Sequence, residues 1–140
     1  MSYDTNNIFA KILRGEIPCH KFYEDDATLA FMDVMPQTDG HALVIPKAPS
    51  RNLLDADPAT LGSLMTSVQK VANAVQTAFD AEGILIKQFN ESAAGQTVFH
   101  LHVHILPRNA GSELRVHSGK MADQRILAKH AGMIRNALAS

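Results

Sequence analysis

The longest regular pattern of apolar positions in the chain predicts an amphipathic helix in its middle. Asp57 and Pro58 are typical of a helix start, because a capping residue is followed by proline at the first helical position. Steps of three and four residues then separate the apolar positions Leu61, Leu64, Met65, Val68, Ala72, Val75 and Phe79. This spacing gives the helix one apolar face to bury, and Gly83 is expected to end it.

Two further helices are expected, one near each end of the chain. Asn6 or Asn7 can cap the first, and Gly15 ends it just after a basic residue. Its apolar residues are Ile8, Phe9, Ile12 and Leu13. Asp123 can begin the last helix. On one side of that helix lie Ile126, Leu127, Ala131, Ile134 and Leu138.

Extended segments are predicted between these helices. They cover residues 20–24, 29–34, 41–46, 84–90 and 96–108. The first two flank the turn pair Asp25-Asp26, as in a β-hairpin. Three strands thus precede the long helix and two follow it, which favours an antiparallel α+β sheet over a parallel one. No repeat, low-complexity tract or domain boundary interrupts this order, so residues 1–140 are expected to form a single domain.

The last extended segment carries three histidines at alternate positions, His100, His102 and His104. Single apolar residues separate and flank them: Phe99, Leu101, Val103 and Ile105. Successive side chains of a β-strand point to opposite faces, whereas a helix would spread the imidazoles over a wide arc. We therefore predict a strand with a row of three imidazoles on one face and an apolar underside.

The composition is that of an ordinary soluble globular domain, with 46% hydrophobic and 19% charged residues. The formal net charge is -1 and no run of like charges occurs, which argues against binding to nucleic-acid polymers or anionic membranes. A polar N-terminus and the lack of an apolar stretch of roughly 18 residues argue against a signal peptide and a membrane span. Cys19 is the only cysteine, which excludes an internal disulfide and a multi-cysteine zinc site. A cytoplasmic location is expected.

Three functions are open to a row of imidazoles. Histidine is the commonest metal ligand, but three ligands along one strand do not easily close a compact site, and no obvious carboxylate or cysteine stands near the motif. A neutral imidazole can instead attack phosphorus and form a phospho- or nucleotidyl-histidine, if an acceptor holds the proton of its other nitrogen. Asn90, Gln96 and Thr97 are neutral donors nearby, and Gly95 allows the close approach of an anion. Exposed histidines without a task are the third reading, which suits a lone histidine better than this row.

Several segments of the chain resemble the histidine-triad (HIT) family. The residues His100-Leu101-His102-Val103-His104-Ile105-Leu106 match its His-x-His-x-His-x-x signature. Further matches, in family order, are Ile8-Phe9, residues 15–18, Phe31-Met32-Asp33, Pro36-Gln37, residues 40–47 and Asn90-Glu91. The resemblance implies a HIT-like fold, with a five-stranded antiparallel sheet and two main helices. It also implies a homodimer with a continuous ten-stranded sheet.

The resemblance further implies hydrolysis or transfer at the α-phosphate of nucleoside 5′-monophosphate derivatives, as in the purine nucleoside phosphoramidases of the Hint-like branch. By matching positions, His102 is the nucleophile that becomes nucleotidylated, and His104 contacts the phosphate. His100 and His41 complete the histidine cluster that sets its protonation. The implied nucleotide-binding residues are Ile8, Phe9, Phe31, Asp33, Val34, Leu43, Asn90, Gln96 and Thr97. Among these, Asp33 would accept hydrogen bonds from the ribose hydroxyls.

The chain also departs from the family pattern. Many bacterial relatives bind zinc through a Cys-x-x-Cys opening and a later histidine, and the matching positions here hold Asn7, Ala10 and Ser50. No metal and no cofactor are therefore expected. Residues 96–98 and 106–108 also resemble the Fhit-like dinucleoside polyphosphate hydrolases, so the branch stays open. A nucleotide-binding adaptor with little turnover is the remaining alternative.

The other candidate residues are expected to be structural. Cys19 has no charged activator beside it in the sequence and is expected to be an inert thiol. His20, His117 and His130 are expected to be exposed residues without a role. The resemblance adds one reservation, because the segment 108–120 in this family can reach the active site of the partner subunit.

Overall fold

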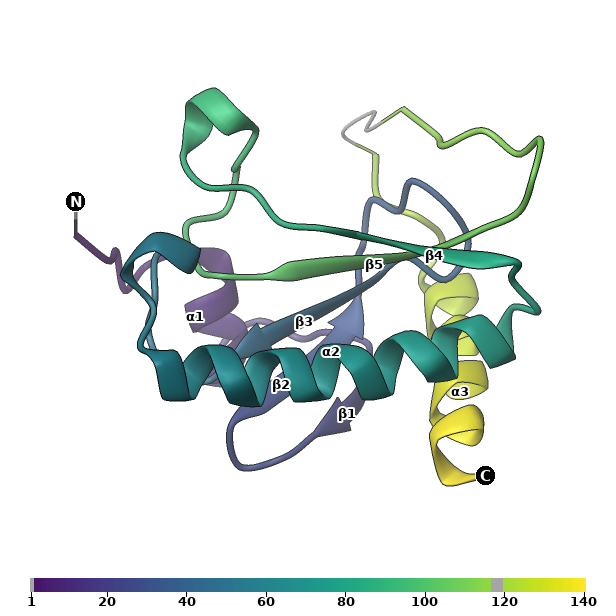
Figure 1. Ribbon diagram of the computed structural model, residues 1–140, viewed down its shortest axis with the longest axis horizontal. Coiled ribbons are helices and arrows are strands. Elements are labelled where there is room, and N and C mark those ends of the chain that lie inside the picture. Colours follow the sequence, from purple (N-terminus) through teal and green to yellow (C-terminus); the bar gives the residue numbers. More distant parts are fainter. Residues whose placement is uncertain (1, 117–119) are drawn as a thin grey trace.

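The computed structural model describes residues 2–116 and 120–140, which form a five-stranded sheet with helices on both faces (Figure 1). The helices are α1 (Ile8–Leu13), α2 (Pro58–Ala78) and α3 (Gln124–Ala139), with the short 3-10 turns η1 (Leu53–Asp55) and η2 (Ser92–Ala94). The strands are β1 (Lys21–Glu24), β2 (Thr28–Met32), β3 (Ala42–Pro46), β4 (Gly83–Lys87) and β5 (Val103–Arg108). None of the helices in the described part of the chain is long and apolar enough to cross a membrane.

All neighbouring strands are antiparallel, in the order β1-β2-β3-β5-β4. The first two form the predicted hairpin. Asn7 and Asp123 cap α1 and α3 as expected, since their side chains accept hydrogen bonds from the backbone N–H groups of Ala10 and Arg125. The α+β class and the five-stranded antiparallel sheet expected from the sequence are confirmed.

The two faces of the sheet are covered by different helices. Ala30 and Val44 lie in the core beneath α2 and α3. Because successive side chains of a strand point to opposite faces, Phe31 and Leu43 lie on the other face, where they pack with Phe9 of α1. Figure 1 shows α2 running across one face of the sheet, with α3 near its C-terminal end. His102 and His104 lie on the sheet face that α1 covers.

The predicted helices are wrong in two details. The long helix ends at Ala78 and not at Gly83, which is the first residue of β4. Asp80 instead adopts a positive φ of 48° and turns the chain toward that strand. Met65 and Ile126, which were expected on the apolar faces, are 49% and 48% exposed. Each lies one residue away from the buried stripe of its helix, which is about 100° around the helix axis.

The histidine strand is shorter than predicted. β5 begins only at Val103, which pairs with Val44, and two positions further along this register Leu101 would stand opposite Pro46. Proline has no N–H and cannot extend the ladder. The N–H of Leu101 donates instead to the carbonyl oxygen of Ser50 at 2.9 Å. The chain therefore enters the sheet only after His102, and the prediction of one strand carrying all three histidines is wrong.

A glycine turn precedes β3 and carries the fourth histidine of the predicted cluster. Gly40 has a φ of +85°, and a Cβ at this position would lie 2.7 Å from the ring of Phe79. Glycine suits both the conformation and the lack of space. The turn thus contacts Phe79 at the end of α2 and places His41, which is 1% exposed, directly before β3.

Candidate active site

The site lies on the sheet face opposite α2, along a row that crosses three strands. The register pairs Leu43 of β3 with His104 of β5, and His104 with Lys87 of β4. Directly paired residues of antiparallel strands project on the same face. Leu43 belongs to the cluster packed by α1, so His104 and Lys87 share that face. His102 comes just before β5, and its ring centroid stands 5.0 Å from that of His104.

His102 has the arrangement that a nucleophilic imidazole needs. Its Nδ1 lies 2.6 Å from the backbone carbonyl oxygen of His100. A carbonyl only accepts hydrogen bonds, so Nδ1 carries the proton and Nε2 keeps its lone pair. Among the described residues, no buried side-chain nitrogen or oxygen lacks a partner and none bonds to this Nε2, which therefore opens to the cavity surface. Burial lowers the pKa of His102, against the raising effects of the His100 carbonyl and of Asp33, and keeps the ring neutral at pH 7.

His41 and His104 form a second hydrogen-bonded pair. The backbone N–H of Gln37 donates to Nδ1 of His41 at 3.1 Å, so the proton of His41 is on Nε2. That Nε2 lies 2.9 Å from Nδ1 of His104 and 3.4 Å from Oδ2 of Asp33. Nδ1 of His104 is therefore an acceptor, and a neutral His104 carries its proton on Nε2. The site thus combines a lone pair on His102 with an N–H donor on His104.

His100 stands apart from the other two histidines of the motif. Its ring is fully buried, where Nε2 donates to the carbonyl oxygen of Pro46 at 2.8 Å. The hydroxyl of Tyr3 then donates to Nδ1 at 2.6 Å. Burial lowers the pKa of His100 to about 4, although the Pro46 carbonyl acts in the opposite direction. The three imidazoles of the predicted row therefore differ in role, because His102 and His104 line cavities whereas the ring of His100 is buried and its backbone carbonyl holds His102.

Two adjoining cavities meet at His102 and His104. The first has a volume of about 220 Å³ and is largely apolar. It is lined by seven of the nine predicted nucleotide-binding residues, namely Ile8, Phe9, Phe31, Asp33, Val34, Leu43 and Thr97. The second has a volume of about 270 Å³ and carries more polar side chains. Its lining consists of Asp33, Gln37, His41, Lys87, Phe89, Gly95, Thr97, His102 and His104.

The structure brings neither Asn90 nor Gln96 to these cavities. The amide of Gln96 is buried, where Oε1 accepts from Asn52 and from the backbone of Glu91, and Nε2 donates to two backbone carbonyls. Oδ1 of Asn90 accepts from the backbone N–H of Leu53 at 3.0 Å. Both side chains hold the loop between β4 and β5, and their contact with a phosphate remains a prediction.

Asp33, His41 and His104 are close enough to be tested as metal ligands, since their ligand atoms lie within 4.8 Å of one another. The sequence indicated Asp33 as a ribose-binding residue but not as a metal ligand, and this residue directly follows β2. The hydrogen bonds do not fit a metal ion. Ligation by Nε2 of His41 would move its proton to Nδ1, where it would face the N–H of Gln37. We therefore assign no metal here, and its absence stays a prediction.

Two residues of the site were not singled out from the sequence. Tyr3 reaches His100 from the N-terminal segment, and no local pattern indicates that contact. Lys87 lines the polar cavity beside His104. The alternation of side chains along residues 84–90 could have indicated Lys87, but only together with the register of β4 against β5.

Of the other candidate residues, His20 and His130 lie outside both cavities. His20 makes a hydrogen bond to the start of α3, and His130 packs edge-on against Phe79. Both are half-buried, not exposed as expected. Cys19 lies in the wall of the apolar cavity, where burial raises the pKa of its thiol and disfavours the reactive thiolate. His117 lies outside the described residues.

Comparisons with known proteins agree with this geometry. A family model described as HIT domain matches residues 14–111. A Hit-like protein of Bartonella henselae, described as involved in cell-cycle regulation, has 55% identity and a TM-score of 0.91 over 97% of this chain and 99% of its own. A hypothetical histidine triad nucleotide-binding protein of Sulfolobus tokodaii has 32% identity and a TM-score of 0.86 over 94% of this chain and 91% of its own.

A curated relative is adenylylsulfatase HINT3 of Arabidopsis thaliana, which is 38% identical over 120 residues. The match covers 81% of this chain but only 61% of that relative, so the chain spans less than two thirds of its length. The family model covers more than half of the chain, and the matched residues include His41 and all three histidines of the motif. The chain therefore belongs to the HIT family.

Proposed function

We propose that the protein is a nucleotide hydrolase or transferase that acts at the α-phosphate of nucleoside 5′-monophosphate derivatives, with His102 as the nucleophile. The observation that carries this proposal is the 2.6 Å hydrogen bond from Nδ1 of His102 to the His100 carbonyl oxygen, which leaves the Nε2 lone pair to the substrate. An imidazole in this tautomer is a competent nucleophile near neutral pH. The names of the Arabidopsis and Sulfolobus relatives, an adenylylsulfatase and a nucleotide-binding protein, support a nucleotide substrate.

In this proposal the nucleoside occupies the apolar cavity and the phosphates occupy the polar one. Phe9, Phe31 and Leu43 offer apolar walls to a flat base. Asp33 lines both cavities, which is the position that a ribose between base and phosphate would take. Its carboxylate can accept hydrogen bonds from the ribose hydroxyls.

The reaction proceeds in two displacements. Nε2 of His102 attacks the α-phosphorus, so that a P–N bond to the histidine forms while the bond to the leaving group breaks. The Nε2–H of His104 donates to a phosphoryl oxygen and stabilises the charge of the transition state. An amine leaving group takes up one proton from solvent as it departs. Water then adds to phosphorus and breaks the P–N bond, which releases the nucleoside monophosphate, returns a proton to solvent and restores the lone pair.

The substitution His102→Ala tests the proposal. It should lower kcat/KM on adenosine 5′-phosphoramidate or diadenosine polyphosphate by about 10⁴-fold or more, as expected for the loss of a nucleophile. Mass spectrometry of quenched single-turnover reactions should detect one nucleotidyl group on the wild type and none on the variant. His20→Ala removes a histidine outside the site and should keep wild-type turnover. Full turnover by a folded His102→Ala protein would overturn the proposal.

Two leaving groups are compatible with this mechanism. The Hint-like phosphoramidases release an amine, and the chain resembles them in its N-terminal pattern. The Fhit-like hydrolases release a nucleotide anion, and the ammonium group of Lys87 in the polar cavity favours an anion. Rates on a phosphoramidate and on a diadenosine polyphosphate, measured side by side, separate these candidates. Tight binding of AMP with negligible turnover of either would indicate an adaptor instead.

We also propose that two copies of the chain pair through β4. This strand lies at the edge of the sheet, and its Leu85 and Ile86 are 37% and 41% exposed. An exposed apolar edge strand is a template for pairing, and a two-fold pairing would continue the sheet. Light scattering should give the mass of two chains, and Ile86→Lys should reduce it to one. Ile126→Lys, at a similarly exposed position on α3, should leave it unchanged, and a monomeric wild type would contradict the proposal.

A further inference from the structure

We infer that Lys87 makes the site selective for substrates whose leaving group is an oxyanion, such as a sulfate or a phosphate, over substrates that release an amine. The inference rests on the proposed function, because it concerns the leaving-group end of the same site. Lys87 is the one ammonium-bearing residue among the described residues that line the polar cavity. That cavity also holds His102, the nucleophile of the proposed reaction.

The position of Lys87 follows from the sheet. Its Cα is paired with that of His104 across β4 and β5, so both side chains project from the same face. Nζ donates to Oε1 of Gln37 at 2.5 Å, and it lies 5.8 Å from the centroid of the Phe89 ring. The backbone N–H of Gln37 in turn donates to Nδ1 of His41. The ammonium group is therefore held beside the histidines by a neutral amide and an aromatic face.

The charge of Lys87 is available to a ligand. Within the described part of the chain no ion pair joins it to a carboxylate. Asp33 supplies the one carboxylate that lines the same cavity, and its oxygens are near the N–H groups of His41 and Met35. An ammonium group has three N–H donors, so Lys87 can keep its bond to Gln37 and still donate to an anion. A charge-assisted bond to an oxyanion is about twice as strong as a bond between neutral groups.

The charge of the leaving group explains why Lys87 would distinguish anhydrides from phosphoramidates. When Nε2 of His102 bonds to the α-phosphorus of an anhydride, the P–O bond breaks and the oxygen keeps the electron pair. Sulfate or a nucleotide phosphate then leaves as an anion without taking up a proton. Lys87 stabilises the negative charge that develops on this oxygen. A phosphoramidate releases its nitrogen as a protonated, uncharged or cationic amine, which gains nothing from a nearby ammonium group.

The test compares Lys87→Met with the wild type on three nucleotides. The substrates are adenosine 5′-phosphosulfate, diadenosine triphosphate and adenosine 5′-phosphoramidate, which release sulfate, ADP and ammonia. For the two anhydrides kcat/KM should fall about 10- to 100-fold, the worth of one charge-assisted hydrogen bond. For the phosphoramidate it should stay within about threefold. A fall on one anhydride alone identifies which oxyanion Lys87 serves.

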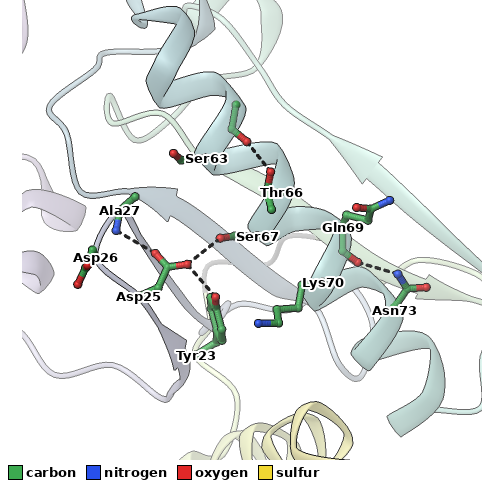
Figure 2. A pocket seen from close by; sticks show the side chains of 11 residues that line it. Tyr23, Asp25, Asp26, Ala27, Ser63, Thr66, Ser67, Gln69, Lys70 and Asn73 are labelled. Carbon is green, nitrogen blue, oxygen red and sulfur yellow. Dashed lines mark hydrogen bonds between the residues drawn. The ribbon is translucent and has the colours of Figure 1, made fainter.

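Two further variants control for structure. Lys87→Arg keeps the charge and should keep the preference for anhydrides. Lys70→Met removes an ammonium group that lies 5.0 Å from the ring centroid of Tyr23 in the hollow beside Asp25 (Figure 2). Lys70 lines neither histidine cavity, so this variant should change no rate. Equal losses on all three nucleotides would show that Lys87 only braces Gln37 and would overturn the inference. So would unchanged rates on both anhydrides.

A binding measurement separates the failure of this inference from the failure of the proposed function. If the wild type cleaves none of the nucleotides, the proposed function fails. Calorimetric titration of His102→Asn and of His102→Asn with Lys87→Met still tests Lys87 without turnover. Loss of Lys87 should weaken the binding of adenosine 5′-phosphosulfate about tenfold or more, and that of the phosphoramidate much less. Equal affinities of the two proteins for the phosphosulfate would overturn the inference.

Discussion

A polar hollow beside Asp25 differs from the polar site around His102. The hollow beside Asp25 lies between the β1–β2 turn and α2, and its volume is about 730 Å³ (Figure 2). The carboxylate of Asp25 accepts hydrogen bonds from both the hydroxyl and the N–H of Thr28, and from Ala27, Tyr23 and Ser67. Although burial raises its pKa, these bonds hold the pKa of Asp25 well below its usual range.

The histidine site is smaller but leaves hydrogen-bonding capacity open. Its two cavities have volumes of about 220 and 270 Å³. One nitrogen of His102 is fixed by a carbonyl at 2.6 Å, and the other faces the cavity with its lone pair. In the larger hollow the carboxylate of Asp25 is used to hold the β1–β2 turn. In the smaller site one nitrogen of His102 has a partner and the other is open to a substrate. Size alone would not have singled out the histidine site.

Like the carboxylate of Asp25, the ring of His100 has hydrogen-bond partners at all of its polar atoms, whereas His102 has one nitrogen open. The largest expected effect is therefore the dependence of stability on pH through His100. Burial lowers the pKa of folded His100 from 6.5 to about 4, so the unfolded chain takes up a proton first. The contribution of neutral His100 to the free energy of unfolding should be fully present above pH 6.5. The free energy of unfolding should then fall by about 3 kcal/mol as the pH drops toward 4. Urea unfolding of the wild type and of His100→Gln across this range measures the difference. An identical pH dependence of the two proteins would contradict it.

Tyr3 should matter to stability because it completes the network of His100. Tyr3→Phe removes the hydroxyl that donates to Nδ1 at 2.6 Å and leaves a buried acceptor without its donor. The free energy of unfolding should fall by about 2 kcal/mol. Tyr23→Phe is the matched control in the other hollow, where the hydroxyl bonds to the exposed Asp25 and its loss should cost less than about 1 kcal/mol. Equal decreases in the free energy of unfolding of Tyr3→Phe and Tyr23→Phe, measured by chemical denaturation, would contradict this prediction.

Asp25→Ala should separate stability from activity. It removes the acceptor of the β1–β2 turn, but Asp25 is exposed, so water replaces part of the lost bonding and the loss of stability should be about 1 kcal/mol. Turnover of any nucleotide that the wild type cleaves should be unchanged at a temperature where both proteins are folded. A selective loss of kcat would show that the larger hollow takes part in the reaction.

Removal of metal ions should have the smallest effect. The protonated Nε2 of His41 does not suit ligation, so exhaustive dialysis against a chelator should leave turnover and melting temperature unchanged. Metal analysis of the protein before dialysis provides the control. Activity that is lost with the chelator and regained with one divalent ion would place a metal among Asp33, His41 and His104.

Local sequence patterns predicted much of the fold. Asn7 and Asp123 were recognisable as caps, and the turn pair at Asp25 marked the hairpin. The end of α2 was not predictable in the same way. The chain turns at Asp80 with a positive φ, a conformation that glycine adopts more readily and that was therefore expected near Gly83. Tertiary packing decided this boundary, and local propensity did not.

Some residues of the candidate site were predictable from the sequence, but its arrangement was not. Alternation predicted that His102 and His104 share a face, and both line the same cavities. His100 lies before β5, and its buried imidazole donates to the carbonyl oxygen of Pro46. The contacts of Tyr3 and Lys87 depend on segments that meet only in the folded chain. Sequence separations of 97 and 50 residues join Tyr3 to His100 and Lys87 to Gln37. No periodicity encodes such contacts.

The close approach of Gly40 to the Phe79 ring has a mechanical consequence. That ring touches the turn before His41 on one side and, on the other, stands 5.1 Å from the His130 ring of α3. The two large helices carry none of the reacting groups, yet their packing fixes how far this turn can withdraw. A smaller side chain at Phe79 would give the turn room to retreat. The geometry around His104 is thus adjustable from the other face of the sheet, without any substitution among the residues that line the cavities.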